Sequence, residues 1–330
     1  MPNYNGVWSL TTQIQYASDW SADNISPAAL AAGGGGGRAV FSIGVTGSVT
    51  NTLEFTTIFT GSTFTDFGDS TVTAQARNSL SSDTRGVTGG GTNSATNVMD
   101  YITLASAGNA TDFGDLSRTK HGTMPAASAT RGLFGGGAAA DSNEIEYITI
   151  SSTGNVTDFG DFSISYRGSG GSCQSTTRAL FAGGGPNGEG GRESIDYVTI
   201  ASTGNASDFG DLTDGRFTGV GGGSSNTRGI FYGGNDSGDD GSNIIDFVTI
   251  SSTGNATDFG DLLANKGYLG CGASNKTAVL NLGGYVSSNI ASADLIFLAS
   301  TGNAVDFGAI ATGGASRNSS GMCGSHGGIA

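Results

Sequence analysis

The stretch Asn109–Leu116, "NATDFGDL", recurs down the chain with few changes. A carboxylate needed for catalysis is needed once or twice, whereas a residue that builds a junction is needed at every junction. The Asp-Phe pair of this motif stands at six places, separated by 46, 46, 50, 50 and 48 residues: Asp66-Phe67, Asp112-Phe113, Asp158-Phe159, Asp208-Phe209, Asp258-Phe259 and Asp306-Phe307. A period of about 40 to 50 residues is typical of propellers and repeat arrays.

Each repeat unit divides into four short β-like stretches. The fifth unit reads "RFTGVGGG", "TRGIFYGG", "IIDFVTISS" and "ATDFGDL", with turn signals between them. Both faces of the third stretch carry apolar residues, as expected for a strand that packs against a neighbour on each side. No sustained helical period occurs, which argues against a helical solenoid. Four strands make one blade, so we expect an all-β, six-bladed β-propeller.

The last residues of the chain are expected to close the ring. Unit one begins at "GGGGGRAVF", already in its second strand, and the tail "ATGGASRNSSGMCGSHGG" resembles the missing glycine-rich strand. Pairing of this tail with the N-terminal strands would complete a blade and remove open sheet edges. The expected divisions are an N-terminal extension 1–32, repeats at about 33–70, 71–116, 117–162, 163–212, 213–262 and 263–310, and a closing strand 311–330.

The repeated residues suggest how blades are joined. In "STGNATDFGD" we expect a tight Gly-Asn hairpin, a Phe ring packed between blades, and a Gly-Asp turn toward the next blade. Units one to five also share an arginine, replaced by Thr277 in unit six, and a second aspartate, replaced by Ala309. We expect an ion pair within about 4 Å, or a shared backbone-bridging network, between two sets: Arg38, Arg85, Arg131, Arg178 and Arg228 with Asp69, Asp115, Asp161, Asp211 and Asp261.

Composition excludes several classes of function. The 28 acidic and 14 basic residues give a formal charge of −14, which disfavours nucleic acid as a partner. No apolar run approaches the length of a membrane span, and "MPNYNGVWSL" lacks the features of a signal peptide. We therefore expect a soluble protein made in a cytoplasm. Three cysteines without a CxxC pair, Cys173, Cys271 and Cys323, favour small-residue packing, with a reactive thiol or a Cys271–Cys323 contact as alternatives.

Candidate catalytic and cofactor residues are few. The glycine runs lack the Gly-Lys-Ser/Thr of a phosphate loop, and His121 and His326 are isolated. The loop "NDSGDDGSN" carries three carboxylates that could offer ligands to Ca²⁺, although its spacing favours a solvated acidic loop: Asp236, Asp239 and Asp240. We expect no enzyme activity, no cofactor and no dedicated metal site. A sialidase-like hydrolase would need unlike residues at one rim, whereas here the acids and arginines repeat.

The order of motifs in each unit resembles the kelch repeat. A double glycine follows the second strand, an apolar-acidic-aromatic strand such as "IDYVTI" comes next, and "DFGDL" ends the unit, with Phe where kelch repeats usually have Trp. Together with the N-terminal "NGVWSLTTQIQYASDW", the repeats resemble kelch-like structural proteins of tailed, particularly marine, bacteriophages. This resemblance implies a virion protein of the tail or fibre type, with other virion proteins or itself as partners.

Two regions are candidate contact surfaces. Residues 1–32 lie outside the repeat and are rich in aromatic residues, so they either pack on the propeller or anchor it to a partner through Trp8, Tyr16 and Trp20. The connections between the second and third strands vary most from unit to unit, which favours them as a binding surface. A carbohydrate-binding propeller that recognises a host-surface glycan is the alternative function.

Overall fold

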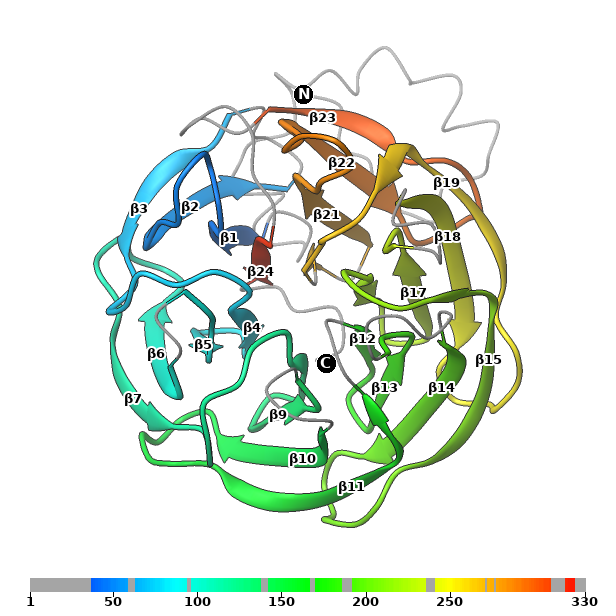
Figure 1. The fold of residues 1–330 in the computed structure, drawn as a ribbon, viewed down its shortest axis with the longest axis horizontal. Helices are drawn as coiled ribbons and strands as arrows, with labels where there is room; N and C mark the ends of the chain where they lie inside the picture. The colour runs from blue at the N-terminus through cyan, green and yellow to red at the C-terminus, as the bar shows by residue number, and fades with distance from the viewer. Residues whose placement is uncertain are drawn as a thin grey trace, which may run out of the picture.

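The chain folds into a ring of six four-stranded sheets around a central axis (Figure 1). This is a computed structural model, and it describes residues 37–58, 63–93, 96–137, 142–166, 170–185, 192–235, 241–270, 272–275, 277–309 and 318–323. All strand pairs within the sheets are antiparallel, and no α-helix occurs among the described residues. The predicted all-β, six-bladed propeller with four strands per blade is confirmed.

The strands of each blade run from the axis outward in chain order, except that β24, the last described strand, is the innermost strand of the first blade. The first three blades contain β24 (Ser320–Cys323), β1 (Arg38–Ser42), β2 (Thr52–Thr57) and β3 (Thr65–Asp69); β4 (Asn78–Ser81), β5 (Arg85–Gly89), β6 (Val98–Thr103) and β7 (Thr111–Asp115); and β8 (Met124–Ala127), β9 (Arg131–Gly135), β10 (Ser142–Thr149) and β11 (Thr157–Tyr166). The last three contain β12 (Gly171–Gln174), β13 (Arg178–Ala182), β14 (Arg192–Thr199) and β15 (Ser207–Arg216); β16 (Gly221–Ser224), β17 (Arg228–Tyr232), β18 (Ser242–Thr249) and β19 (Thr257–Lys266); and β20 (Ala273–Ser274), β21 (Ala278–Leu282), β22 (Ser292–Phe297) and β23 (Val305–Ala309).

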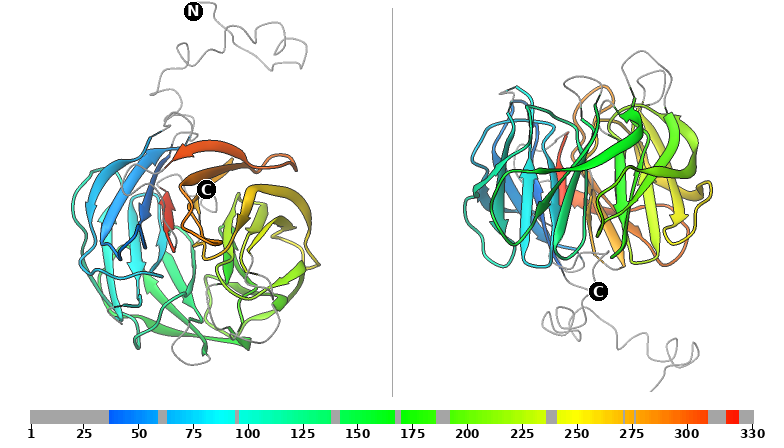
Figure 2. Two further views of the ribbon diagram at one scale, coloured as in Figure 1. Left: turned by 45° about the horizontal axis from the view of Figure 1, so that its top comes forward. Right: turned by 90° about the horizontal axis from the view of Figure 1, so that it is seen from below.

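The ring closes as the sequence predicts. The C-terminal strand β24 pairs antiparallel with β1 and supplies the innermost strand of the first blade, with Val40 opposite Met322. In Figure 2 the sheets are arranged around the axis, with their strands roughly parallel to it in the right-hand view. Because β24 fills the place that the N-terminal sequence leaves empty, the inner edge of β1 is paired.

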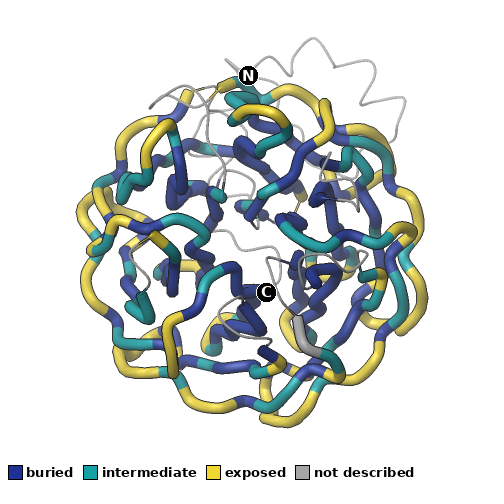
Figure 3. The backbone as a smooth tube through the Cα atoms, in the orientation of Figure 1, coloured by how far each residue is buried: buried dark blue, intermediate teal, exposed yellow. Residues whose placement is uncertain are grey.

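The core lies in the gaps between neighbouring blades. Phe67 of the first blade, for example, is buried with Ile102 and Leu104 of the second. Figure 3 shows buried residues along the strands and exposed residues in the outer connections. The third strand of each blade contributes to two gaps, because alternate residues face opposite neighbours: Met99 packs toward the third blade and Ile102 toward the first. This explains its apolar residues on both faces.

Small residues let the innermost strands meet at the axis. A side chain at Gly222 would overlap the backbone of Ser172 on the neighbouring blade, and one at Gly321 would overlap Ala273. Glycine is therefore required at these two contacts between inner strands. The glycine-rich first stretch of each unit is a packing feature of the ring.

Candidate functional site

The glycine of the Asp-Phe-Gly-Asp motif forms a bulge in the outer strand. Gly68 lies inside β3 with a φ of 142°, and the register of β3 with β2 shifts beside it. A Cβ at this position would lie 2.5 Å from the carbonyl oxygen of Gly108. The predicted Gly-Asp turn is thus wrong: Asp69 ends the strand itself, and the glycine admits the backbone of the next blade.

The Gly-Asn pair of the motif binds the preceding blade. Gly108 donates its N–H to the carbonyl of Phe67 at 2.7 Å, and Ala110 donates to the carbonyl of Asp69 at 2.8 Å. The Asp69 N–H donates to Oδ1 of Asn109 at 3.1 Å. We call these three hydrogen bonds the junction clamp. The predicted tight hairpin is wrong, because the link between β6 and β7 spans residues 104–110 and lies along β3 of the first blade.

The junction clamp recurs at four further junctions with the same three hydrogen bonds. The segments that make it are Gly154–Val156 on β7, Gly204–Ala206 on β11, Gly254–Ala256 on β15 and Gly302–Ala304 on β19. The Phe between the bonded groups is buried in the gap between blades, as predicted: Phe67, Phe113, Phe159, Phe209 and Phe259. In blade six Phe307 is partly buried. The repeated motif therefore joins blades.

The repeated arginines join the same blades in another way. Arg85 lies over the ring of Tyr101, 4.2 Å from its centroid, and donates to the carbonyl of Ile150 on the next blade at 2.9 Å. The other four arginines repeat both contacts: Arg38 with Phe55 and Leu104, Arg131 with Tyr147 and Ile200, Arg178 with Tyr197 and Ile250, and Arg228 with Phe247 and Leu298.

The predicted ion pair between these arginines and the second aspartate is wrong. Arg85 stands opposite Thr103 at one end of β6, whereas Asp115 stands opposite Val98 at the other end. The two sets bridge the blades separately, so the alternative of one shared network is also wrong. The register corrects unit six as well, because Ala278, paired with Phe297, occupies the place that Arg178 holds opposite Thr199. Thr277 precedes that place by one residue.

A different ion pair, which the sequence analysis missed, is buried inside the blades. A basic residue pairs with the acidic residue of the third strand of a blade, and it lies either on the connection that enters that blade (Arg77, Lys120) or at the end of the preceding outer strand (Arg216, Lys266). In the described residues this occurs as Arg77–Asp100 at 3.0 Å, Lys120–Glu146 at 2.7 Å, Arg216–Asp246, and Lys266–Asp294 at 3.0 Å. The signal was present: a basic residue follows each outer-strand motif, and the acidic residue precedes the aromatic residue in "IDYVTI".

These carboxylates are enclosed by their partners. Asp246 and Asp294 are 0% exposed. Burial raises the pKa of Asp294 and lowers that of Lys266, and the attraction between the two charges opposes both shifts. Asp100 also accepts from the N–H and the hydroxyl of Thr71, each at 2.8 Å. The bonds of these carboxylates hold the chain that enters a blade against that blade. None of these carboxylates faces solvent.

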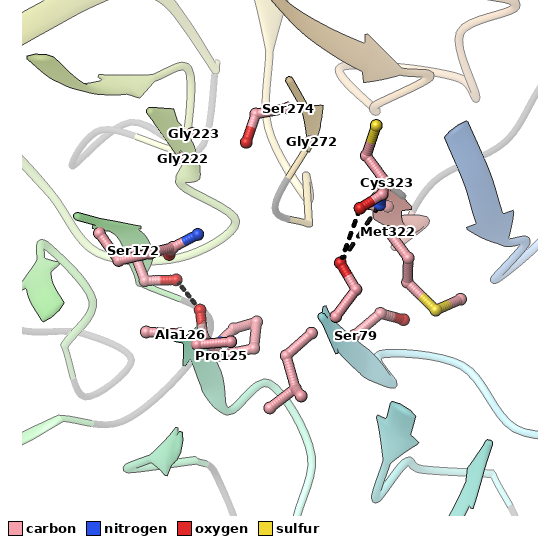
Figure 4. Close-up of a pocket in the computed structure, with 15 residues that line it drawn as sticks. Ser79, Pro125, Ala126, Ser172, Gly222, Gly223, Gly272, Ser274, Met322 and Cys323 are labelled. Atoms are coloured by element: carbon pink, nitrogen blue, oxygen red, sulfur yellow. Dashed lines mark hydrogen bonds between the residues drawn. The ribbon is translucent and has the colours of Figure 1, made fainter. Parts of the chain in front are cut away.

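The axial cavity is the hollow that the six inner strands share (Figure 4). Its volume is about 30 Å³, close to the share of one water molecule in the liquid. Lining hydroxyls are already bonded: Ser172 donates to the carbonyl of Pro125 at 2.5 Å, and Ser81 donates to that of Cys323 at 3.2 Å. Ligand pockets are typically about ten times larger or more. A cavity of this size can hold water.

The described parts of the variable connections lie at one end of the propeller, which we call the loop face. Isolated bridges tie them to the segments that enter each blade: Gln75 to Thr92, Thr218 to Asn235, and Gly267 to Tyr285. The half-buried rings of Tyr268 and Tyr285 meet edge to face at 5.7 Å. Tyr268 has a φ of 50°, a conformation that costs a non-glycine residue about 1 kcal/mol or more.

The remaining predicted site residues are placed as follows. His121 is half-buried at the loop face, where burial lowers its pKa. Cys173 and Cys323 are buried. Several predicted residues lie outside the described residues, namely Trp8, Tyr16, Trp20, Asp236, Asp239, Asp240, Cys271 and His326. Where the structure describes side chains, no group of three or more His, Cys, Asp or Glu gathers to hold a metal, and no helix is long and apolar enough to span a membrane.

Comparison with known proteins does not narrow this picture. No family model matches the chain, and no curated protein is significantly similar to it. The blade pattern and the ring closure are shown by the structure alone. The chain is a six-bladed β-propeller whose scaffold is compatible with protein–protein or ligand binding.

Proposed function

We propose that the chain is a non-enzymatic structural protein of a tailed-bacteriophage particle, made in the host cytoplasm and assembled into the tail, fibre or capsid surface. One observation carries the proposal: the repeated charged residues are used within and between blades, while the connections that differ between blades share one face. The kelch-like repeats and the N-terminal "GVWSL" segment support a virion protein. The loop face contacts other virion proteins and, in a tail or fibre, the host surface.

The non-enzymatic part of the proposal rests on where the acids lie. A glycoside hydrolase needs two carboxylates that reach one substrate. The acids of the third strands, such as Asp246 and Asp294, are buried against cations and hydroxyls. The acids of the outer strands repeat at the periphery and do not converge on one place. These arrangements favour a scaffold.

Particle incorporation tests the assignment. Ser288 is exposed in the sixth-blade loop, whereas Thr153 is exposed in a connection between third and fourth strands, at the opposite end of the ring. We expect Ser288→Arg to lower the amount of the protein in purified particles and the matched Thr153→Arg to leave it unchanged, as quantified by peptide mass spectrometry. Absence of the unchanged protein from purified particles would refute the virion assignment. Equal losses in both variants would refute the role of the loop face.

Carbohydrate binding is the second candidate, and the pair Tyr268–Tyr285 favours it. Aromatic rings are common in ligand sites, and this pair lies on the variable face. A glycan array of host-surface saccharides tests the idea. Specific binding that is lost in Tyr285→Ala and kept in Tyr101→Phe, whose ring packs between blades, would support a lectin-like function. An array without signal at high protein concentration would eliminate it.

A further inference from the structure

Blade six departs from the other blades on the face that meets blade one. Four positions of this face that repeat in blades one to five carry different residues there, and every change removes a polar or aromatic group or adds an apolar one. They are Ala278 for Arg, Leu295 for Tyr or Phe, Phe297 for Thr, and Val305 for Thr or Ser. Alternation along the strands turns all four toward blade one, whereas Ala309 pairs with Ser292, which Lys266 of blade five contacts.

The inner part of this face is packed against blade one. Ala278 and Leu295 belong to one buried cluster with Phe41 and Phe64 of the first blade. The ring of Phe64 lies 5.9 Å from that of Phe41 and 6.1 Å from that of Phe307. Apolar and aromatic contacts therefore join the last blade to the first, where other junctions use an arginine and an asparagine.

The outer part of the same face remains exposed. Phe297 is 46% and Val305 is 44% exposed, and with Leu263 they are the large exposed hydrophobic side chains among the described residues. Leu295 pairs with Val305, and Phe297 follows two residues later on the same face, so the two exposed side chains are neighbours. We call Phe297 and Val305 the rim patch. In blades two to five both places carry exposed Thr or Ser.

Apolar residues beside an outer strand are usually avoided, because such an edge recruits other chains. The rim patch stands where polar residues suffice in the other blades. The apolar replacements therefore point to a segment that covers them. The adjacent blade identifies the segment, because β1 of blade one is the strand to which residues 1–36 lead.

The sequence of that leading segment suits the patch. In "VWSLTTQIQY", Val7–Tyr16, most apolar residues fall on one side of an extended chain, where Trp8, Leu10, Ile14 and Tyr16 are joined by Thr12. The other side carries Ser9, Thr11, Gln13 and Gln15 together with Val7. The residues between Tyr16 and β1 span ~3.3 Å each when extended, which is ample to reach across one blade junction. Tethering also raises the local concentration of such a segment to about the millimolar range.

We propose that residues 7–16 dock on the rim patch as an added extended segment, with Trp8, Ile14 and their apolar neighbours against Phe297 and Val305. The N-terminal extension then seals the junction between the last and first blades on its outside, as β24 seals the first blade at the axis. The inference stands apart from the proposed virion role and holds for the isolated chain.

Both tryptophans of the protein, Trp8 and Trp20, lie in the N-terminal extension, so tryptophan emission reports its docking directly. The full chain should show blue-shifted emission and slow acrylamide quenching. The double variant Phe297→Thr/Val305→Thr, which installs residues that other blades carry at these places, should shift the emission to the red and accelerate quenching severalfold. The matched control Leu263→Thr removes the third exposed apolar side chain, on blade five, and should change neither signal.

A second full-length variant tests the other side of the contact. Trp8→Ser/Ile14→Ser should leave the remaining Trp20 more quenchable and raise the tendency of the protein to self-associate, measured by light scattering. Emission typical of free tryptophan in the unchanged chain, or unchanged emission in the Phe297/Val305 double variant with far-UV circular dichroism intact, would overturn the proposal. So would a dimer that dissociates in the double variant without any emission change, since a second copy would then cover the patch.

Discussion

Asp69 of the first blade donates its backbone N–H to the side-chain oxygen of Asn109 in the second, at 3.1 Å. The bond connects residues of two sheets that share no strand pairing. Two backbone hydrogen bonds flank it, from Gly108 to Phe67 and from Ala110 to Asp69. The outer strand of one blade thus pairs over a few residues with a connection of the next. The same arrangement is found at five junctions in all.

Removing the asparagines should weaken the ring in additive steps. Each Asn→Ala change at the junction clamp deletes one exposed hydrogen bond, for a cost near the low end of the usual range, and the sites are far enough apart to add. We expect the variant with all five changes to lose about 2 to 4 kcal/mol in urea unfolding. The changes are Asn109→Ala, Asn155→Ala, Asn205→Ala, Asn255→Ala and Asn303→Ala. Asn265→Ala, at an exposed position, is the control. A loss of stability there equal to the loss per clamp asparagine would contradict the role of the clamp.

The bulge glycine should tolerate no side chain. Gly68→Ala adds a methyl group 2.5 Å from the Gly108 carbonyl oxygen, in addition to the strain of a φ of 142°. Gly47→Ala is a matched control, because Gly47 also has a positive φ, 113°, but nothing lies within 4 Å of its added methyl group. We expect Gly47→Ala to cost about 1 kcal/mol and Gly68→Ala at least twice as much in denaturant unfolding. Equal costs would mean that the blade-to-blade approach does not constrain Gly68.

The buried pair Lys266–Asp294 should be costly to break and easy to replace. Asp294→Asn leaves an ammonium group buried without its counter-charge, so we expect a loss of about 3 to 5 kcal/mol. The double variant Lys266→Met/Asp294→Leu removes both charges and should recover most of that loss. Thermal unfolding of the three proteins gives the comparison. A double variant as unstable as the single one would show that charge compensation is not the main role of the pair. The pair would then be needed to position the chain that enters blade six.

His121 should make the protein less stable as the pH falls. Burial lowers its folded-state pKa below the ordinary 6.5, so the unfolded chain binds the proton more readily. The stability is fully present above pH 6.5 and declines from there down to the lowered pKa. His121→Gln should flatten this part of the profile, measured as the difference in melting temperature between pH 7.5 and pH 5. A profile parallel to that of the unchanged protein would show that His121 protonates equally well in both states.

Truncation should separate the closing strand from the residues that follow it. A chain that ends after residue 317 lacks β24 and exposes the paired edge of β1, so we expect aggregation on expression. A chain that ends after Cys323 keeps every described strand and should remain monodisperse in size-exclusion chromatography. Aggregation of both truncated chains would show that residues 324–330 also contribute to closure.

The period of the motif was sufficient to predict the fold, because spacing and strand count per unit do not depend on side-chain contacts. The contacts themselves were harder to predict. Arg85 and Asp115 both recur once per unit, yet antiparallel pairing places them at opposite ends of β6. Recurrence in a repeat gives no information on which partner a charged group meets, because every repeated residue has the same spacing as every other.

The buried pairs were missed for a related reason. Arg77 and Asp100 stand 23 residues apart and Lys266 and Asp294 stand 28 apart, so loops of different length hide their constancy. The basic residue also stands at different distances from the preceding motif, because Arg77 follows Asp66 by 11 residues and Lys266 follows Asp258 by 8. The acidic residue precedes an aromatic residue at Asp100 but Leu295 at Asp294. The assignment of Thr277 to the arginine position was wrong by one residue. The strand pairing of Ala278 with Phe297 identifies the correct position, which the sequence alone did not.

The pairing of Val40 with Met322 joins strands 282 positions apart and sets the order of events during synthesis. While the ribosome is still adding residues, the first blade has three of its four strands and cannot be finished. Its inner edge stays open until residues 320–323 have been translated. The ring is therefore expected to close late, when β24 becomes available to β1, and chains that stop before β24 should keep the first blade unfinished.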